Sequence, residues 1–430
     1  MLDLSPPVIE TIALNWPETS AGGVLGDGRS ASATDRPSSL EELCEIVARR
    51  VGEGHALYPQ GGATALDHGG IPRRPGVAID LRGLARVVDY PAADMTITIE
   101  AGMTLAALQK TLGEQGQRLT LEAPLADRAT LGGIFATNAS GPRRFGLGRP
   151  RDQIIGIRYV DGEGRAIKGG GRVVKNVAGY DLPKLLTGSM GTLGIIAELT
   201  LKVRPKPEAS ALAWVRFRRL ADAAQALDRL NTSGTRPVAL ELLNAPTARK
   251  VGGGAGLPVE EWVLVVGFED NAASVAWQLD RLTLELGRTD LVFLKDNDSA
   301  PLWSALVDSQ ADEDAPLTFA ANLKPSAALV FLGSIDAARW AIQTHAGNGI
   351  VRGHFQDEAN FEEIAPEVDR LRAEAVRLGG SLTLPRCPTG WKDRLKVWGN
   401  PRADWAIAEK VKKALDPRGV LNPGRFVGVI

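Results

Sequence analysis

Cysteine is almost absent from this sequence of 430 residues, which contains only Cys44 and Cys387. Two thiols cannot supply the ligands of a zinc site or of a typical iron–sulfur cluster without help from other residues. They can form one disulfide at most, which is typical of a protein from a reducing compartment. An iron–sulfur protein is therefore disfavoured.

Neither sign of charge is in surplus, because 50 basic residues face 51 acidic ones. A nucleic-acid-binding protein or a polybasic membrane anchor needs a positive surplus, so both classes are disfavoured. No run approaches 18 apolar residues, and the acidic start of the chain does not resemble a signal peptide. We therefore expect a cytoplasmic protein that reaches the inner membrane, if at all, only through partners.

The signature motifs of several enzyme classes are also missing. The sequence has no Gly-x-Gly-x-x-Gly segment opening a helix, no Gly-Lys-Ser/Thr phosphate loop, no His-Glu-x-x-His and no Gly-x-Ser-x-Gly. These absences disfavour a nicotinamide-binding Rossmann fold, a P-loop kinase, a zinc protease of that type and an α/β-hydrolase.

Glycine is abundant, with 48 residues, or about one in nine against a usual ~7%. The first cluster follows a predicted strand and reads YPQGGATAL over residues 58–66. Its backbone amides could converge on a phosphate, or the segment could be an ordinary tight turn. The second cluster, ATLGGIFATNASG over residues 129–141, is long, uncharged and built from small residues. We expect it to be a loop wrapped around an extended cofactor, so the two clusters together suggest a dinucleotide bound outside a Rossmann fold.

The spacing of apolar residues changes along the chain and divides it into parts. Residues 1–35 show little periodicity and are expected to be loose. A helix is expected from Ser39 to Gly52, with Ser39 and Glu42 in a capping-box pattern. Pro205 and Pro207 mark the best domain boundary, since proline disfavours both helix and central strand. After this boundary, strands alternate with helices, which indicates helices on one face of an antiparallel sheet.

The two clusters and three further segments resemble the vanillyl-alcohol-oxidase/PCMH family of FAD flavoproteins. These segments read KNVAGYDL at 175–182, GSMGTLGII at 188–196 and LDPRGVLNPGR at 415–425. The last is similar to the C-terminal signature of the FAD-linked oxidase branch. Within that branch, the sequence is most similar to the FAD-binding subunits of bacterial glycolate oxidases.

The resemblance implies an α+β fold, with a two-part PCMH-type FAD-binding domain and an α+β cap domain built on an antiparallel sheet. The expected division is a leader over 1–29, the FAD-binding domain over 30–206, a cap or substrate domain over 207–385, and a C-terminal segment over 386–430 that returns to the FAD-binding domain.

The resemblance also implies which residues bind FAD: the first cluster at the pyrophosphate, Gly194–Ile196 near the adenine, and Asn422 near the isoalloxazine. The full set is Pro59, Gln60, Gly61, Gly62, Ala63, Thr64, Ala65, Leu66, Pro124, Ala129, Thr130, Leu131, Gly132, Gly133, Thr137, Asn138, Ala139, Ser140, Gly141, Gly194, Ile195, Ile196 and Asn422. Some relatives attach FAD to a histidine at the position of Ala63, so here the FAD is expected to be non-covalent. His68, the nearest imidazole, is expected to be a solvated loop residue.

The sequence differs from the hydroxy-acid-oxidising members of this family at the residues that bind a metal in those members. Their motif is similar to His-Ala-Gly-Asp-Gly-Asn-Leu-His, whereas this chain has HAGNGIVR at 345–352, with Arg352 in place of the second histidine. Pro385 and Arg386 stand where the relatives have Glu-His. We therefore predict that no metal is bound, with His345 structural; a shifted site that uses His354 is the alternative.

Arg352 and Arg386 are the candidate substrate residues. Guanidinium groups there could bind a carboxylate in bidentate fashion; alternatively, they pair with acidic neighbours or contact a partner subunit. The resemblance implies an FAD-dependent oxidoreductase of the 2-hydroxy-acid dehydrogenase type. It would act in a complex with a metal-dependent flavoprotein subunit and an iron–sulfur subunit, and would oxidise glycolate to glyoxylate. A non-catalytic electron-transfer or assembly subunit, and a stand-alone oxidoreductase of another hydroxy acid or alcohol, are the alternatives.

Overall fold

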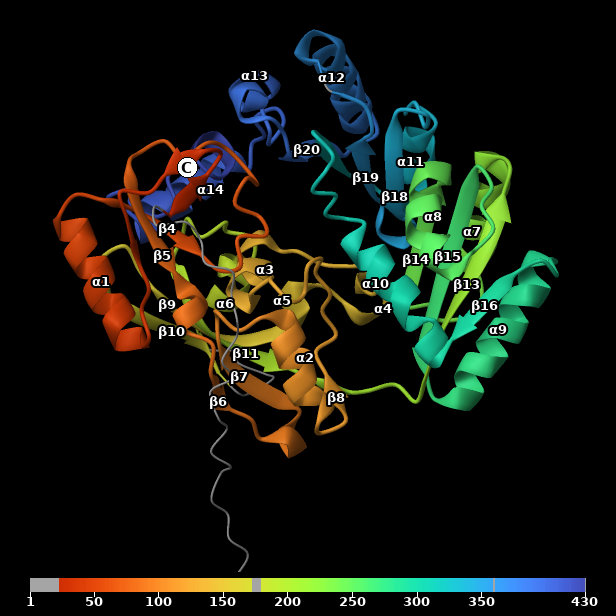
Figure 1. Ribbon diagram of the computed structural model, residues 1–430, viewed down its shortest axis with the longest axis horizontal. Helices are drawn as coiled ribbons and strands as arrows, with labels where there is room; N and C mark the ends of the chain where they lie inside the picture. Colours follow the sequence, from red (N-terminus) through yellow and green to blue (C-terminus); the bar gives the residue numbers. More distant parts are fainter. Residues whose placement is uncertain (1–22, 172–178, 359, 430) are drawn as a thin grey trace, which may run out of the picture.

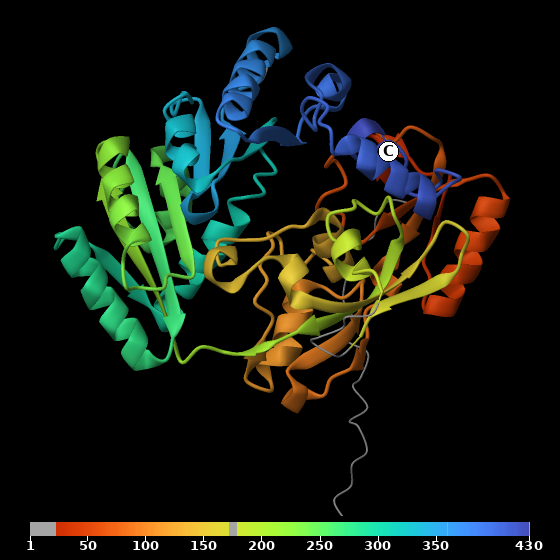
Figure 2. The same ribbon diagram turned by 180° about the vertical axis from the view of Figure 1, so that it is seen from behind.

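The computed structural model describes residues 23–171, 179–358 and 360–429. They form two lobes that stand side by side (Figure 1). We call residues 23–205 the N-terminal lobe, residues 209–386 the cap lobe, and residues 387–429 the C-terminal segment. The chain crosses between the lobes between β12 (Arg204–Pro205), which pairs with β8 (Gln117–Arg118), and β13 (Ala209–Phe217). Figure 2 shows this connection from behind.

The first layer of the N-terminal lobe is a parallel sheet in the order β3-β5-β4, formed by Ala33–Asp35, Gly76–Asp80 and Ala56–Gln60. Helix α1 (Leu40–Gly52) packs on this layer through an apolar face that includes Leu43 and Val47. The Ser39 side chain accepts a hydrogen bond from the Glu42 amide at 3.1 Å, which confirms the predicted helix start.

The second layer of the N-terminal lobe is an antiparallel sheet in the order β10-β9-β11-β7-β6. Its strands are Ala166–Gly170, Ile154–Val160, Ile195–Lys202, Thr96–Glu100 and Val87–Asp89. Helices α2 (Leu105–Gly113) and α3 (Leu131–Thr137) contribute Leu108, Leu131 and Phe135 to the apolar core on this sheet. The short helices α4, α5 and α6 span Arg144–Leu147, Pro150–Gln153 and Leu182–Leu186.

Two expectations about the N-terminal lobe are wrong. Residues 23–35 are not loose, because β1 (Val24–Gly26), β2 (Arg29–Ser30) and β3 form there. The second glycine cluster is not a loop throughout, because residues 131–137 form α3, whose Thr130 cap accepts from the Gly133 amide. Small residues allow this helix to lie close to the sheet: a Cβ atom on Gly132 would come 2.9 Å from the Cβ of Ala101. Residues 175–178 of the segment KNVAGYDL lie outside the described residues.

The cap lobe is built on one antiparallel sheet in the order β16-β13-β15-β14-β18-β19-β17-β20. Besides β13, its strands are Val292–Lys295, Trp262–Asp270, Ala239–Asn244, Trp340–His345, Ile350–Phe355, Thr318–Asn322 and Ser381–Arg386. Its helices are α7 (Leu220–Asn231), α8 (Ala245–Gly252), α9 (Ala272–Leu286), α10 (Ala300–Asp308), α11 (Pro325–Leu332) and α12 (Phe361–Arg377).

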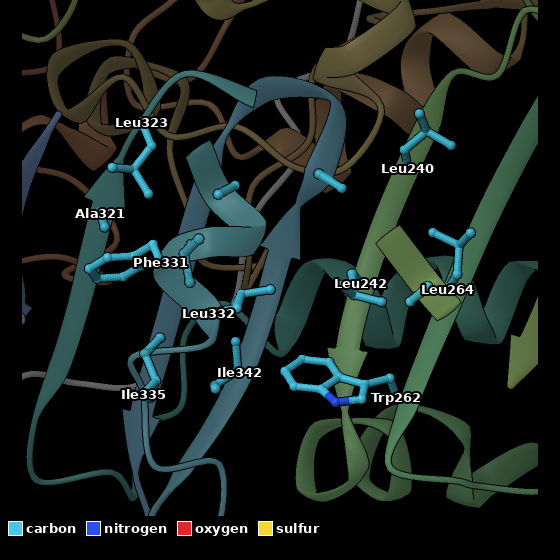
Figure 3. Packing of buried hydrophobic residues seen from close by; sticks show 14 of the residues in the cluster. Leu240, Leu242, Trp262, Leu264, Ala321, Leu323, Phe331, Leu332, Ile335 and Ile342 are labelled. Atoms are coloured by element: carbon cyan, nitrogen blue, oxygen red, sulfur yellow. The ribbon is translucent and has the colours of Figure 1, made fainter. Parts of the chain in front are cut away.

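Helices cover both faces of this sheet, so the expectation of helices on one face is wrong in part. Helices α7, α9, α11 and α12 enclose the larger core with the even-numbered residues of β14 and β18, such as Leu242 and Ile342. Figure 3 shows side chains from β14, β18 and α11 meeting in this core. Helices α8 and α10 pack on the opposite face, against Trp214 and Val265. Beyond these two helices, His345 of β18 and Ile350 and Arg352 of β19 line the space toward the N-terminal lobe.

The C-terminal segment contains α13 (Lys392–Leu395) and α14 (Trp405–Leu415) and returns to the N-terminal lobe (Figure 1). Its last part runs beside β4: the Leu57 amide donates to Val420 O at 2.8 Å, and the Asn422 amide donates to Leu57 O at 2.8 Å. Among the described residues, no helix is long and apolar enough to cross a membrane.

Candidate functional site

The two glycine clusters meet the C-terminal segment around one cavity, which we call the loop cavity. Its lining comes from residues within 58–66, 123–125, 129–139 and 190–196, together with Asn422 and Arg425. Small side chains and backbone form most of the wall. The Arg425 guanidinium donates hydrogen bonds to Asp27 Oδ2 at 2.5 Å and to Gly70 O at 2.8 Å. The cavity can therefore accept an extended ligand along exposed backbone.

The first glycine cluster presents unused hydrogen-bond donors. Among the described residues, no acceptor is recorded for the backbone amides of residues 61–66, which follow the end of β4. A backbone amide away from water needs an acceptor, and consecutive amides in a tight loop form an anion-binding concavity. This arrangement suits the pyrophosphate of a dinucleotide and favours the phosphate-binding interpretation over an ordinary turn.

Gly62 is held at this place by the neighbouring cluster. A Cβ atom on Gly62 would lie 1.7 Å from Arg128 O, and one on Gly61 would lie 1.9 Å from Thr130 Oγ1. These glycines are needed for the two clusters to touch, whereas from the sequence we attributed them to close approach of a phosphate.

Strained backbone gathers around the same cavity. Nine described residues other than glycine have a positive φ angle, and five of them line this cavity or the adjoining one: Ala63, Leu125, Asn138, Met190 and Asn422. Such a conformation costs about 1–3 kcal/mol when a residue other than glycine adopts it, so the surrounding structure must enforce it. The Asn422 side chain donates to Met190 O at 2.6 Å and links two of the five.

Most of the residues that we predicted to bind the cofactor lie in these walls. The whole of Pro59–Leu66 lines the loop cavity, as do Pro124, Ala129, Thr130, Gly132, Gly133, Thr137, Ala139, Gly194, Ile196 and Asn422. Asn138 and Ser140 line the adjoining cavity. Leu131, Gly141 and Ile195 line neither, since Leu131 and Ile195 point into apolar cores. The sequence reasoning missed Tyr58, Met190, Gly191 and Arg425.

The adjoining cavity lies between the two lobes, and we call it the cap cavity. It has a volume of about 560 Å³ and shares Ala63–Leu66, His68 and Met190 with the loop cavity. That volume is in the range of small-molecule sites. Its other wall is the sheet face of β17, β18, β19 and β20, so a ligand here would lie beside whatever fills the loop cavity.

Both predicted arginines line the cap cavity. Arg352 stands on β19, and its Nε is buried without a hydrogen-bond partner. Among the described residues, no ion pair or hydrogen bond is recorded for the side chain of Arg352 or of Arg386. Burial, and then the nearby Arg144, lower the pKa of Arg352 to about 10. Within the described ranges, these arginines therefore form no ion pair with an acidic neighbour.

Arg144 is a third guanidinium group in this cavity, and we missed it because nothing in its local sequence singles it out. It comes from α4, whose Gly146 amide donates to Val238 O at 3.1 Å in the cap lobe. The Arg144 Nη1 donates to Ser140 Oγ at 2.9 Å, while its Nε is buried without a partner. Burial, and then Arg149, lower the pKa of Arg144.

His345 lines the cap cavity and is held by a carboxylate that the sequence reasoning missed. Its Nδ1 lies 2.6 Å from Glu241 Oε1, and the Gln343 amide holds Glu241 Oε2 at 2.8 Å. These three residues come from β14 and β18, where Glu241 and His345 are directly paired. The contact orients the imidazole and anchors it to the sheet.

Two further histidines, His68 and His354, are withdrawn from water to different extents. His68 is half-buried rather than fully solvated: its ring stacks on Trp398 with a centroid distance of 5.6 Å, and burial lowers its pKa to about 4. His354 is buried with Nδ1 2.9 Å from Thr318 Oγ1, and burial, then Arg352, lower its pKa to about 3. His354 and His345 lie outside any metal-binding arrangement, since no group of three or more His, Cys, Asp or Glu residues among the described residues could hold an ion.

Comparison with known proteins decides the family. Residues 31–170 match the model of an FAD binding domain, and residues 206–384 and 395–426 match that of the C-terminal domain of FAD linked oxidases. The chain is 30% identical to glycolate oxidase subunit GlcE of Escherichia coli over 90% of its own length and 97% of that protein. It belongs to the FAD-linked oxidases, within the VAO/PCMH flavoproteins.

Other relatives of this FAD-linked oxidase act on a different substrate. It is 26% identical to the mitochondrial D-lactate dehydrogenase [cytochrome] of Arabidopsis thaliana, over 91% of this chain and 72% of that one. Its fold is similar to that of alkyldihydroxyacetonephosphate synthase, with a TM-score of 0.63 at 19% identity over 91% of this chain and 77% of that one. The predicted α+β fold is thereby confirmed, and the chain is an FAD-dependent oxidoreductase.

The divalent metal of the hydroxy-acid-oxidising relatives does not fit this FAD-linked oxidase. The resemblance implies that Arg352 replaces one histidine ligand and that Pro385 and Arg386 replace the Glu-His pair, and these three residues line the cavity. Two guanidinium groups repel a cation, and His345 alone cannot hold a divalent ion. We derive no step through a metal.

Proposed function

We propose that the loop cavity holds one FAD without a covalent bond. The free amides of residues 61–66 would bind the pyrophosphate, and Gly194 and Ile196 would lie near the adenine. Asn422, held by Met190, would face the isoalloxazine at the junction with the cap cavity. The support is the unused row of amides together with the strained residues that surround the cavity.

We propose further that the chain is the FAD-binding subunit of a complex that oxidises a small 2-hydroxy acid, with glycolate the first candidate. The observation that carries this proposal is the unpartnered guanidinium of Arg352 in the cap cavity. Arg352 is half-buried with its Nε inaccessible to water. A cation that is withdrawn from water without a counter-ion is costly, and a carboxylate bound in bidentate fashion reduces that cost. The likeness to GlcE supports the choice of glycolate.

The residues of this chain have defined tasks in such a reaction. Bound FAD would supply the acceptor for the hydride of the carbon that carries the hydroxyl group. The hydroxyl proton would pass to a base in the cavity, where the His345 imidazole, held by Glu241, lines the wall. Arg352 and Arg144 would fix the substrate carboxylate at the sheet, which sets the orientation of that carbon. The lobes would exclude water on both sides, because the cavity wall comes from β17–β20 and from the first glycine cluster.

The electrons must then leave through another protein or a small acceptor. Cys44 is only half-buried and Cys387 is buried, and both are free thiols, so this chain does not supply the four thiolates of a typical cluster. We propose an iron–sulfur subunit as the acceptor and a metal-dependent flavoprotein as the second partner. The name of GlcE, a glycolate oxidase subunit, supports a complex of several subunits.

The second candidate is a non-catalytic subunit that relays electrons from a flavoprotein sibling. It is favoured by the replacement of metal and base positions by Arg352 and Arg386. A stand-alone oxidoreductase of another hydroxy acid or alcohol has no specific observation in its favour.

Dye reduction by the complex tests this proposal. Replacing both Arg352 and Arg386 by Ala should leave the FAD content intact while lowering glycolate-dependent dye reduction at least ~10-fold, as expected for loss of charge-assisted bonds. An unchanged rate contradicts a substrate role for the cap cavity and supports the relay. A full rate from the isolated chain contradicts the subunit assignment.

A further inference from the structure

The cap cavity holds more positive charge than one carboxylate can neutralise. Four arginines line it, and for three of them, Arg144, Arg352 and Arg386, no ion pair is recorded among the described residues. The fourth, Arg402, is exposed and paired with Asp404. Arg144 and Arg352 also have a buried Nε without a partner. A site of this kind is completed by an anionic ligand.

The carboxylates of the same wall are engaged elsewhere. Asp312 pairs with Lys250 at 2.9 Å, and Glu313 lies 3.5 Å from Arg128. Asp67 Oδ1 accepts a hydrogen bond from the Asp27 amide at 2.7 Å. Glu241 lies behind the wall in contact with His345 and Gln343. None of these groups forms an ion pair with the three arginines, although the charge of Glu241 acts on Arg144 and Arg352 and opposes the lowering of their pKa values.

The arginines are spread across the sheet. In the register of the cap sheet, Arg352 on β19 is opposite Ala320 of β17, and Arg386 on β20 is opposite Thr318 of β17. Arg352 and Arg386 are thus two strands apart and offset by two residues, which is about 10 Å across and about 7 Å along the strands. Their backbone positions lie about 12 Å apart on one face of the sheet.

Arg352 and Arg144, by contrast, are close enough to interact. The charge of Arg144 is the largest contribution after burial to the lowered pKa of Arg352. One anionic group between these two arginines leaves Arg386 unpaired at the far side of the cavity. A ligand with two anionic groups on a short carbon chain reaches both positions.

We infer that the cap cavity takes a small 2-hydroxy acid with a second carboxylate, and that it prefers such a diacid to glycolate. Arg352 and Arg144 hold the carboxylate beside the hydroxyl-bearing carbon, and Arg386 holds the distal one. Arg386 is thereby the residue that sets specificity. The inference rests on the proposed function, because it assumes that an oxidisable hydroxy acid binds in this cavity.

Binding of non-oxidisable acids to the FAD-loaded chain is the test, measured by calorimetry or by the change in flavin absorbance at constant ionic strength. Malonate and succinate should bind at least ~10-fold more tightly than acetate and propionate, as expected for one added charge-assisted contact. Arg386→Gln should remove this preference and leave the affinity for propionate unchanged, while Arg352→Gln should weaken both kinds of acid.

Arg402→Gln is the matched control, since Arg402 is exposed at the rim of the same cavity and is paired with Asp404 at 3.1 Å. It should keep the full preference for diacids. Equal affinity for both kinds of acid in the unaltered chain, or a preference that survives Arg386→Gln, would overturn the inference. If instead diacids bind as expected but no 2-hydroxy acid reduces the flavin of the complex, the proposed function fails and the binding site stands.

Discussion

Arg352 and His354 show how single residues set the electrostatics of the cap cavity and of the sheet behind it. Arg352 lies in the register between Ala320 and Gln343, where its guanidinium can point only into the space between the lobes. The same charge acts on His354, whose pKa is lowered by burial first and by Arg352 next. The charge of Arg352 therefore affects both the electrostatics of the cavity and the protonation of a histidine on the same strand.

His354 should make the protein sensitive to acid. Its folded pKa of about 3 lies below the unfolded value of 6.5, so between these values the unfolded chain binds a proton that the folded chain does not. The free energy of unfolding should thus be complete above pH 6.5 and fall as the pH is lowered, by up to ~2.7 kcal/mol at pH 4.5. The groups around the imidazole are Arg352, Asp312, Lys250 and Thr318.

The test is the slope of the melting temperature against pH between 7 and 4.5. His354→Asn should give a shallower slope than the unaltered chain. His55→Asn is the control, because the His55 side chain is 34% exposed at the surface. Identical slopes for the His354 variant and the unaltered chain would contradict the effect of burial.

Gly62 should be indispensable for cofactor binding even against the smallest side chain. Gly62→Ala places a Cβ atom 1.7 Å from Arg128 O, so the two glycine clusters must separate and the row of amides must shift. We expect this variant to lose most of its FAD, measured as flavin absorbance per chain. Gly253→Ala, with nothing within 4 Å of the added atom, should keep it. Full flavin content in the Gly62 variant would show that the loop was assigned wrongly.

Ala63 leaves the first cluster without a side chain that can attach the flavin. Precipitation with acid should therefore release all FAD into the supernatant, where its absorbance is measured. Flavin that stays in the protein pellet would contradict non-covalent binding.

At the scale of elements, the sequence was most informative where one periodicity applied. The bounds of α1 agree with the helix predicted from Ser39 to Gly52, because capping and apolar spacing act locally. The segment 131–137 was expected to be a loop because it is uncharged and built from small residues. Its helix depends on Thr130 as cap and on close packing against Ala101, which is a tertiary contact.

The C-terminal segment illustrates what local patterns cannot predict. Lys412 and Asp416 read as an ordinary surface pair on α14, yet both are buried and lie 2.6 Å apart. The Lys412 ammonium also donates to Thr192 O and to Leu421 O, at 2.7 and 2.8 Å. Lys412 thereby connects α14, the loop before β11 and Leu421, the residue before Asn422. We call this set of contacts the Lys412 network.

Lys412→Met should destabilise the Lys412 network. Removing one partner leaves the Asp416 carboxylate buried without its cation, which costs about 3–5 kcal/mol. We expect this loss in denaturant unfolding, together with weaker retention of FAD. Lys413→Met, which alters an exposed pair with Glu409 on the same helix, should change the stability by less than ~1 kcal/mol. Equal stability of the two variants would contradict the role of the buried ammonium.

For the whole molecule, the contact between the lobes decides where the substrate can lie. Glu269 of the cap lobe is buried between Arg118 and Arg143 of the N-terminal lobe, at 2.7 Å from each. Arg143 also lies 3.6 Å from the ring centre of Trp303. These contacts join the lobes at one side and keep the cap sheet facing the glycine clusters. None of these long-range pairs could be predicted from the sequence, because each partner alone resembles an ordinary surface charge.

The resemblance predicted the cofactor and the architecture, while the cap cavity became visible only in three dimensions. The sequence identified Arg352 and Arg386 as replacements at metal and base positions. It could not show that neither guanidinium group has a recorded partner within the described ranges, nor that Arg144 reaches the same space from the other lobe. The boundaries at residues 29, 206 and 385 stay predictions.

The central claim is that a 2-hydroxy acid in the cap cavity passes electrons to the flavin of this chain. It is tested most directly by anaerobic mixing of the complex with substrate while the absorbance of this chain's oxidised flavin is followed, with the sibling flavoprotein freed of its own flavin. The account predicts rapid bleaching by a 2-hydroxy acid, slowed at least ~10-fold by Arg352→Gln. A flavin that stays oxidised with every 2-hydroxy acid tested would contradict it.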